Sequence, residues 1–99
     1  MARFDVYANP SGNGYLLDVQ ANVLDALNTR IVVPLIPADA APTPAQRLNP
    51  IIEIEAKPCV MVTQLMAAVP RAILRTPVAN IVQHDTAINS ALDMVLIGF

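Results

Sequence analysis

The chain carries few side chains whose type and spacing would suit catalysis. Its single histidine, His84, stands beside Asp85. A catalytic histidine needs a nucleophile and an orienting group within reach, and consecutive residues on a helix do not face each other. We therefore expect His84 to lie at a helix terminus and not to act as a general base.

The acidic residues offer two further candidates. Glu53 and Glu55 alternate with isoleucines, so on a strand they would share one face about 7 Å apart, a spacing compatible with paired-carboxylate hydrolysis. A solvated strand face explains the same pattern, and we favour it. Asp18 is a lone acid among apolar neighbours, which predicts a buried, hydrogen-bonded structural carboxylate.

Sulfur and metal chemistry are equally sparse. Cys59 is the only cysteine, so the chain forms no intrachain disulfide, and this cysteine usage suits a reducing cytoplasm. Its apolar surroundings predict a small buried side chain and not a nucleophile. With one histidine, one cysteine and no acidic cluster, we expect no metal site, no cofactor and no enzymatic activity.

The composition is unusually apolar for a chain of 99 residues, with 55% hydrophobic and only 14% charged side chains. Ordinary domains are about 45–50% apolar and about 25% charged. No apolar run approaches the roughly 20 residues that a membrane-spanning helix needs, and the first residues do not resemble a secretory signal. We expect a homodimer to bury the excess and no membrane association.

Charge argues against a direct grip on nucleic acid. The formal net charge is −2, and the six basic residues are scattered along the sequence. Affinity for DNA or RNA depends on clustered lysine and arginine side chains facing phosphates.

Hydrophobic patterning predicts a single domain, residues 1–99, that is mostly β with one C-terminal helix. Several runs have the alternation or β-branched content of strands, and they are separated by turn signals such as Asn13-Gly14 and by a proline-rich loop at residues 40–49. Pro34 marks an edge, a bulge or a strand end. Such a series indicates a small, curled antiparallel sheet or barrel. The predicted strands are residues 2–8, 15–20, 30–35, 51–56 and 59–70.

The last quarter of the chain changes to a helical period. Ile88, Leu92 and Val95 recur at helical spacing, and Asp85 or Thr86 is a suitable N-terminal cap. Ala91, Met94 and Ile97 fall on other sides, so the helix is apolar over more than one stripe. One stripe can cover the sheet, and the other needs a second partner.

Three stretches in order resemble the CcdB family of bacterial toxins, the toxic halves of toxin–antitoxin pairs. They are "FDVYAN", "LLDVQANVLDALNTRIVVPL" and "DTAINSALDMVLIGF", and "MVTQLMAAVP" fits a further family pattern with Ala68 where serine is usual. The resemblance covers nearly the whole chain. It implies a small homodimer with a curled antiparallel sheet of the CcdB/MazF type and a C-terminal helix at the dimer interface.

The resemblance also implies a function. CcdB is not an enzyme: it binds the A subunit of DNA gyrase and blocks religation of cleaved DNA, and a partly disordered CcdA antitoxin removes it. Toxin and antitoxin together bind and repress their operator, so operator DNA is contacted only through the antitoxin complex. Carried over by motif, the gyrase-binding residues are Val23, Leu24, Asp93, Leu96, Ile97, Gly98 and Phe99. On the two-sided apolar helix, which the resemblance places at the dimer interface, we expect Ala91, Met94 and Val95 to contact the second copy.

Two positions depart from the family pattern. Ile97 stands where gyrase poisons carry tryptophan, and Asp93 stands where they carry asparagine. The tryptophan stacks on gyrase arginines, and a cation–π contact contributes about 0.5–2 kcal/mol per site. The alternatives to a gyrase poison are a relative that retains antitoxin and operator binding without poisoning gyrase, and an endoribonuclease of the MazF kind.

Overall fold

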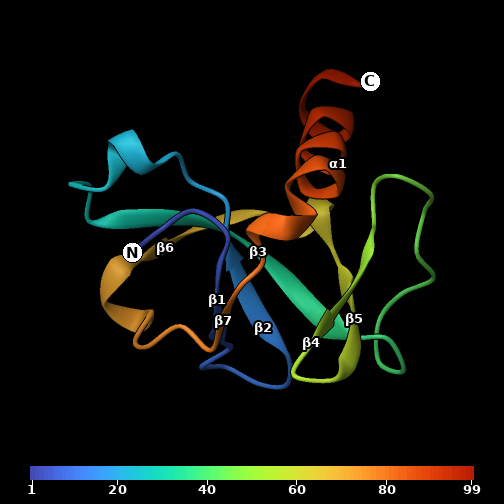
Figure 1. The fold of residues 1–99 in the computed structure, drawn as a ribbon, viewed down its shortest axis with the longest axis horizontal. Helices are drawn as coiled ribbons and strands as arrows, with labels where there is room; N and C mark the ends of the chain where they lie inside the picture. The colour runs from blue at the N-terminus through green and yellow to red at the C-terminus, as the bar shows by residue number, and fades with distance from the viewer.

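The longest strand, β3 (Thr29–Pro37), organises the sheet because it pairs with β2, β5 and β6. A computed structural model describes residues 1–99, and Figure 1 shows the strands curling around one another with a single helix standing against them. All strand pairs are antiparallel, in the order β4-β5-β3-β2-β1-β7 with β6 beside β3. The predicted mostly-β fold with one C-terminal helix is confirmed. The other elements are β1 (Asp5–Ala8), β2 (Tyr15–Asp18), η1 (Asn22–Leu24), β4 (Ile51–Ile54), β5 (Lys57–Met61), η2 (Thr63–Leu65), β6 (Ala67–Pro70), η3 (Arg71–Ile73), β7 (Ala79–Asn80), η4 (Val82–His84) and α1 (Asp85–Ile97).

Pro34 lies inside β3, between the part of the strand that pairs with β6 and the part that pairs with β5. Residues 29–32 of β3 pair with β6 and residues 35–37 pair with β5. The Pro34 carbonyl accepts a hydrogen bond from the Val62 N–H at 3.0 Å, so its ring nitrogen faces the same edge, between β5 and β6. A residue that cannot donate is tolerated there because no ladder partner stands opposite it.

The main core lies between one face of the sheet and α1. The helix contributes Ile88, Ala91 and Leu92, which are all buried. Cys59, at 0% exposure, belongs to this core, which confirms its prediction as a small buried side chain. The cluster consists of Phe4, Val6, Tyr15, Leu17, Val19, Val33, Leu35, Ile52, Ile54, Cys59, Met61, Ile81, Ile88, Ala91 and Leu92.

A second, smaller cluster covers the opposite face of the sheet. Tyr7, Leu16, Val32 and Leu74 pack together there. Successive strand residues point to opposite faces, so these side chains alternate with core residues such as Val6. Tyr7 is buried in this cluster while Val6 is buried on the other face, so β1 carries buried side chains on both faces of the sheet.

The predicted long strand over residues 59–70 is divided into β5, η2 and β6. Thr63 causes the interruption. Its buried hydroxyl donates to the Leu48 carbonyl, and the Met66 N–H bonds back to the Thr63 carbonyl at 3.1 Å. Local bonds of this kind compete with a strand ladder. The division lets β5 and β6 pair with different parts of β3.

The β1–β2 connection is longer than a two-residue hairpin turn. Ala8 pairs with Tyr15, so the loop comprises residues 9–14, closed by a 3.1 Å bond from the Asn9 N–H to the Gly14 carbonyl. Within this loop only Gly14 has a left-handed backbone, with φ of 91°. A Cβ at this position would collide with the Leu35 carbonyl, so glycine is required.

The helix α1 begins at Asp85, directly after β7 and η4. The sequence predicted Asp85 or Thr86 as its N-terminal cap, and this is wrong: His84 occupies the cap position and makes no side-chain cap hydrogen bond. At its other end Gly98 adopts a left-handed conformation with φ of 83°. Its N–H bonds to the carbonyls of Asp93 and Met94 at 3.1 and 3.2 Å. This arrangement is a glycine C-terminal cap.

The proline-rich stretch between β3 and β4 contains no regular element, as predicted. Its last residues are nevertheless anchored. Asn49 is buried, and its side-chain nitrogen donates to the Met61 carbonyl at 3.1 Å and to Gln64 Oε1 at 2.8 Å. The Asn49 side chain thus ties the end of this loop to β5 and η2.

Candidate partner-binding surface

The last turn of α1 exposes large apolar side chains. Leu96, Ile97 and Phe99 are 68%, 60% and 76% exposed, whereas Leu92, one turn earlier, is buried. The Gly98 cap fixes the direction in which the chain leaves the helix. We call residues 94–99 the α1 end. Its apolar surface stands on a regular helix at the far end from the sheet (Figure 1).

The three predicted dimer-interface residues differ in their surroundings. Met94 is 39% exposed and Val95 is half-buried. Ala91 is 0% exposed within the single chain and packs in its main core. Ala91 therefore has no surface to offer a second copy, because the stripe that covers the sheet includes it. Met94 and Val95 remain available.

A second exposed apolar group lies on the connection between β2 and β3. Val23 is 89% exposed and Leu24 is 45% exposed, both in η1. Leu27, which no sequence motif marked, is 48% exposed on the same connection. The sequence signal for Leu27 was that it is a third large apolar residue close to Val23 and Leu24. We call residues 22–27 the η1 segment.

The η1 segment and the α1 end rise on the same side of the sheet in Figure 1, as separate projections. Arg3 links their bases. Its backbone N–H donates to Asn22 Oδ1 at 2.8 Å, and its Nη2 donates to Asn89 Oδ1 on α1 at 2.9 Å. One arginine thus ties the η1 segment to the helix that carries the other apolar group.

Asp18 forms a buried ion pair beneath the η1 segment. Arg30 Nη2 and Nε lie 2.6 and 2.8 Å from Asp18 Oδ2, and both side chains are fully buried. Burial raises the pKa of the Asp18 carboxyl, while hydrogen bonds from Arg30 and the Gln20 N–H oppose that rise. The prediction of a buried, hydrogen-bonded structural aspartate is confirmed.

The candidate acid–base groups lie on separate elements. His84 sits immediately before α1, at the helix terminus expected for it. Glu55 does not share a strand face with Glu53, because it lies in the β4–β5 turn with φ of 50°. There its Oε1 accepts a 2.6 Å hydrogen bond from the Tyr15 hydroxyl, which together with burial raises the pKa of Tyr15 to about 12.

Burial also raises the pKa of the Cys59 thiol, which disfavours the reactive thiolate. No group of three or more histidine, cysteine, aspartate or glutamate side chains is arranged to hold a metal ion. The helices are all too short or too polar to cross a lipid bilayer.

The fold is a curled antiparallel sheet with a single C-terminal α-helix. A solved mycobacterial endoribonuclease in complex with its cognate antitoxin is similar in structure, with a TM-score of 0.76 over 97% of this chain and 94% of that chain. The two sequences are 16% identical, so the likeness concerns the fold alone.

The sequence itself matches the model of the CcdB protein family over residues 3–98. The chain belongs to the CcdB family. Membership confirms the resemblance drawn from its motifs, and it places the chain among the toxins of toxin–antitoxin systems.

Proposed function

We propose that the chain is a homodimeric toxin that binds the A subunit of DNA gyrase and blocks religation of cleaved DNA. The observation that carries the proposal is the α1 end, where Ile97 and Phe99 are 60% and 76% exposed on a capped helix. Exposed apolar patches of this kind mark sites for protein partners. The residues match the positions by which gyrase-binding members of the family contact their target.

Self-association is the second part of the proposal. Met94 and the half-buried Val95 lie within the α1 end, on a part of α1 that the sheet does not cover. A two-fold interface repeats the same patch on both subunits, so it would bring two α1 ends together. Light scattering of the native protein should give a mass of twice 10.6 kDa, the mass of one chain. The Met94→Glu variant should give the mass of a single chain. A native mass near 10.6 kDa would contradict the dimer.

The proposed partners include a CcdA-type antitoxin that neutralises the toxin in the cytoplasm. Operator DNA is contacted only through the toxin–antitoxin complex. The net charge of −2 supports this limit, because the chain lacks the clustered basic side chains that hold phosphates. We propose no cofactor and no catalytic role.

A second candidate function is a family member that binds antitoxin and operator without poisoning gyrase. The specific observation in its favour is the pair of replacements, Ile97 for tryptophan and Asp93 for asparagine. Both lie on the exposed part of α1, and Ile97 cannot provide the stacking of an aromatic ring on an arginine.

Expression without an antitoxin tests the two candidates. A gyrase poison should arrest growth and accumulate cleaved DNA–gyrase complexes, and the purified chain should bind the gyrase A subunit. Ile97→Trp should strengthen that binding by about 0.5–2 kcal/mol per site. Normal growth, together with no gyrase binding by the native chain or by Ile97→Trp, would favour the second candidate. Cleavage of RNA by the purified chain would instead indicate a ribonuclease.

A further inference from the structure

The η1 segment is too short to maintain its own conformation. Its 3-10 helix has three residues, no side-chain cap and no buried side chain. The local backbone hydrogen bonds run from the Leu24 N–H to the Ala21 carbonyl at 3.0 Å, from the Asp25 N–H to the Asn22 carbonyl at 3.1 Å and from the Leu27 N–H to the Leu24 carbonyl at 3.1 Å. In a single hydrogen-bonded turn the conformational entropy lost by fixing the backbone angles exceeds the stabilisation from its few hydrogen bonds, so isolated turns are unstable in water.

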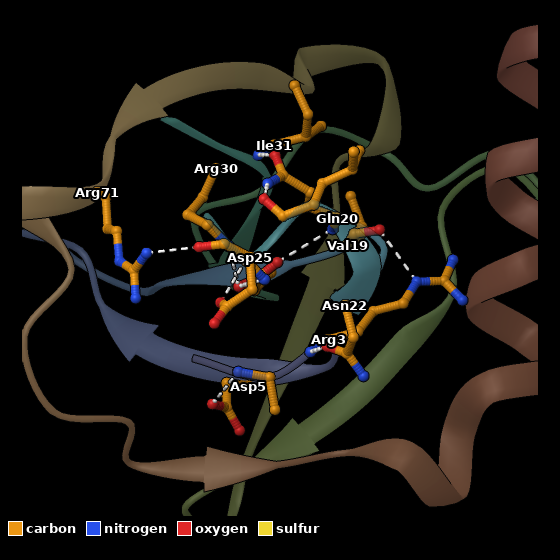
Figure 2. Close-up of polar contacts among 12 residues, drawn as sticks. Arg3, Asp5, Val19, Gln20, Asn22, Asp25, Arg30, Ile31 and Arg71 are labelled. Atoms are coloured by element: carbon orange, nitrogen blue, oxygen red, sulfur yellow. Dashed lines mark hydrogen bonds and ion pairs between the residues drawn. The ribbon is translucent and has the colours of Figure 1, made fainter. Parts of the chain in front are cut away.

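Asp25, which follows η1, is held by both its side chain and its main chain. Arg30 Nη1 lies 3.1 Å from Asp25 Oδ1, and Arg71 Nη1 donates to the Asp25 carbonyl oxygen. Figure 2 shows the two arginines meeting at Asp25 from different elements. Arg30 comes from β3, and Arg71 opens η3 beyond β6. We call these three residues the Asp25 clamp.

The fixed end of the clamp lies in the protein interior. Arg30 is fully buried and divides its guanidinium between Asp18 and Asp25. The Asp25 side chain is 47% exposed, so the same guanidinium reaches from a rigid buried carboxylate to one at the surface. Since Asp18 already orients Arg30, the Asp25 carboxylate meets a donor whose position is set in advance.

Gln20 adds a parallel attachment one residue earlier. Its side-chain nitrogen donates to the Leu24 carbonyl at 3.1 Å, and its side-chain oxygen accepts from the Ile31 N–H at 3.1 Å. The consecutive carbonyls of Leu24 and Asp25 are therefore bound by side chains that come from outside the η1 segment. These attachments fix the backbone on which Val23 and Leu24 are displayed.

We propose that Asp25 is a positioning residue, whose clamp preorganises the η1 segment as a rigid docking element for the protein partner. The inference rests on the proposed function, in which Val23 and Leu24 contact gyrase. A loop that is already ordered loses less conformational entropy on association, and this strengthens binding without any new contact. Asp25 acts through the backbone and does not need to touch the partner.

The test compares Asp25→Ala with Asp39→Ala in the full chain. Asp39 is an exposed loop carboxylate with no ion pair, so the control removes the same charge without disturbing the η1 segment. Residue-resolved amide exchange should accelerate by about tenfold or more at Leu24, residue 25 and Leu27 in Asp25→Ala alone, because local opening governs exchange there. Exchange in β2 and β3 should stay unchanged.

Binding to purified gyrase A subunit provides the readout that a purely structural role would not move. Asp25→Ala should weaken it by about tenfold at an unchanged melting temperature, whereas Asp39→Ala should not weaken it. Asp25→Asn, which retains the acceptor oxygen, should restore part of the affinity. Combined with Leu24→Ala, the effect of Asp25→Ala should shrink, since residues acting through one contact are not additive.

Failure of the clamp and failure of the proposed function give different results. A native chain that does not bind gyrase A overturns the gyrase assignment, and the exchange comparison still decides whether the clamp orders the η1 segment. Unchanged exchange at Leu24 and Leu27 in Asp25→Ala overturns the clamp. Faster exchange with undiminished gyrase affinity overturns the positioning role.

Discussion

The α1 end and the η1 segment both expose apolar side chains, yet different interactions hold them in place. The α1 end continues a helix of 13 residues, and its backbone is bonded within the helix and closed by Gly98. The η1 segment has one short turn and depends on Arg30, Arg71 and Gln20. A long helix can carry an exposed apolar surface unaided, whereas a short connection needs polar side chains that reach it from the interior.

The substitution with the largest expected effect removes Arg30, the buried residue that holds the η1 segment. Arg30→Met leaves the Asp18 carboxylate buried without its partner, and breaking a buried pair in this way costs about 3–5 kcal/mol. We expect the free energy of unfolding, measured by urea denaturation, to fall by that amount. Arg75→Met, at an exposed arginine with no ion pair, is the matched control. Equal stability of the two variants would show that the anchor contributes little.

A second test compares two leucines one turn apart on α1. Leu92→Ala removes a side chain from the main core and should destabilise the protein by about 2–5 kcal/mol. Leu96 is 68% exposed, so Leu96→Ala should change stability by less than about 0.5 kcal/mol. Thermal unfolding at one protein concentration measures both. A comparable loss in Leu96→Ala would mean that the α1 end packs against its own chain or against a second copy.

Alkaline titration examines the surroundings of Tyr7, which packs near the Asp18–Arg30 pair. Burial, followed by the charges of Asp5 and Asp18, raises the pKa of Tyr7 to about 12. A raised pKa favours the protonated folded state, so this contribution to stability is complete below the unfolded pKa of about 10 and is lost as pH rises through about 12.

The chain has two tyrosines and no tryptophan, so tyrosinate absorbance reports on these groups alone. Tyr15, bonded to Glu55, serves as a reference distant from the η1 segment. Tyr15→Phe should leave a single transition near pH 12 that belongs to Tyr7. A midpoint near pH 10 in the folded protein would contradict the burial of this hydroxyl.

Deleting residues 97–99 should have only a small effect on stability. Ile97 and Phe99 are mostly exposed, so their loss should lower the melting temperature by no more than a few degrees. Binding to the gyrase A subunit should disappear. Unfolding of the shortened chain would show that these side chains belong to the core.

The sequence predicted the fold where a local pattern and its tertiary role coincide. Alternating Ile52 and Ile54 gave a strand, and the helical period from Asp85 to the Gly98 cap gave α1, because burial of one face leaves a regular signal. The residues of the α1 end that we propose to bind gyrase came from the family motif, and they are exposed in the structure.

Other features depend on contacts between distant residues. Residues 59–70 have strand composition throughout, and the bonds that divide them include one from Thr63 to Leu48, which is distant in the sequence. Ala91 was assigned to an interface because helical spacing does not tell which apolar stripe faces the sheet. The pairing of Arg30 with both Asp18 and Asp25 requires β2, β3 and η1 to meet, and no single stretch of sequence records that meeting.

The position of Pro70 bears on how the protein stays dispersed in a crowded cell. β6 has β3 on one side only, and the Arg71 N–H faces β3 by donating to the Asn28 carbonyl at 2.8 Å. By alternation, residues 68 and 70 turn their nitrogens to the open edge, where proline has no hydrogen to donate. Unpaired strand edges invite strands of other molecules to add to them, and proline is one natural deterrent. Pro70 thus makes the open edge of β6 a poor template for aggregation.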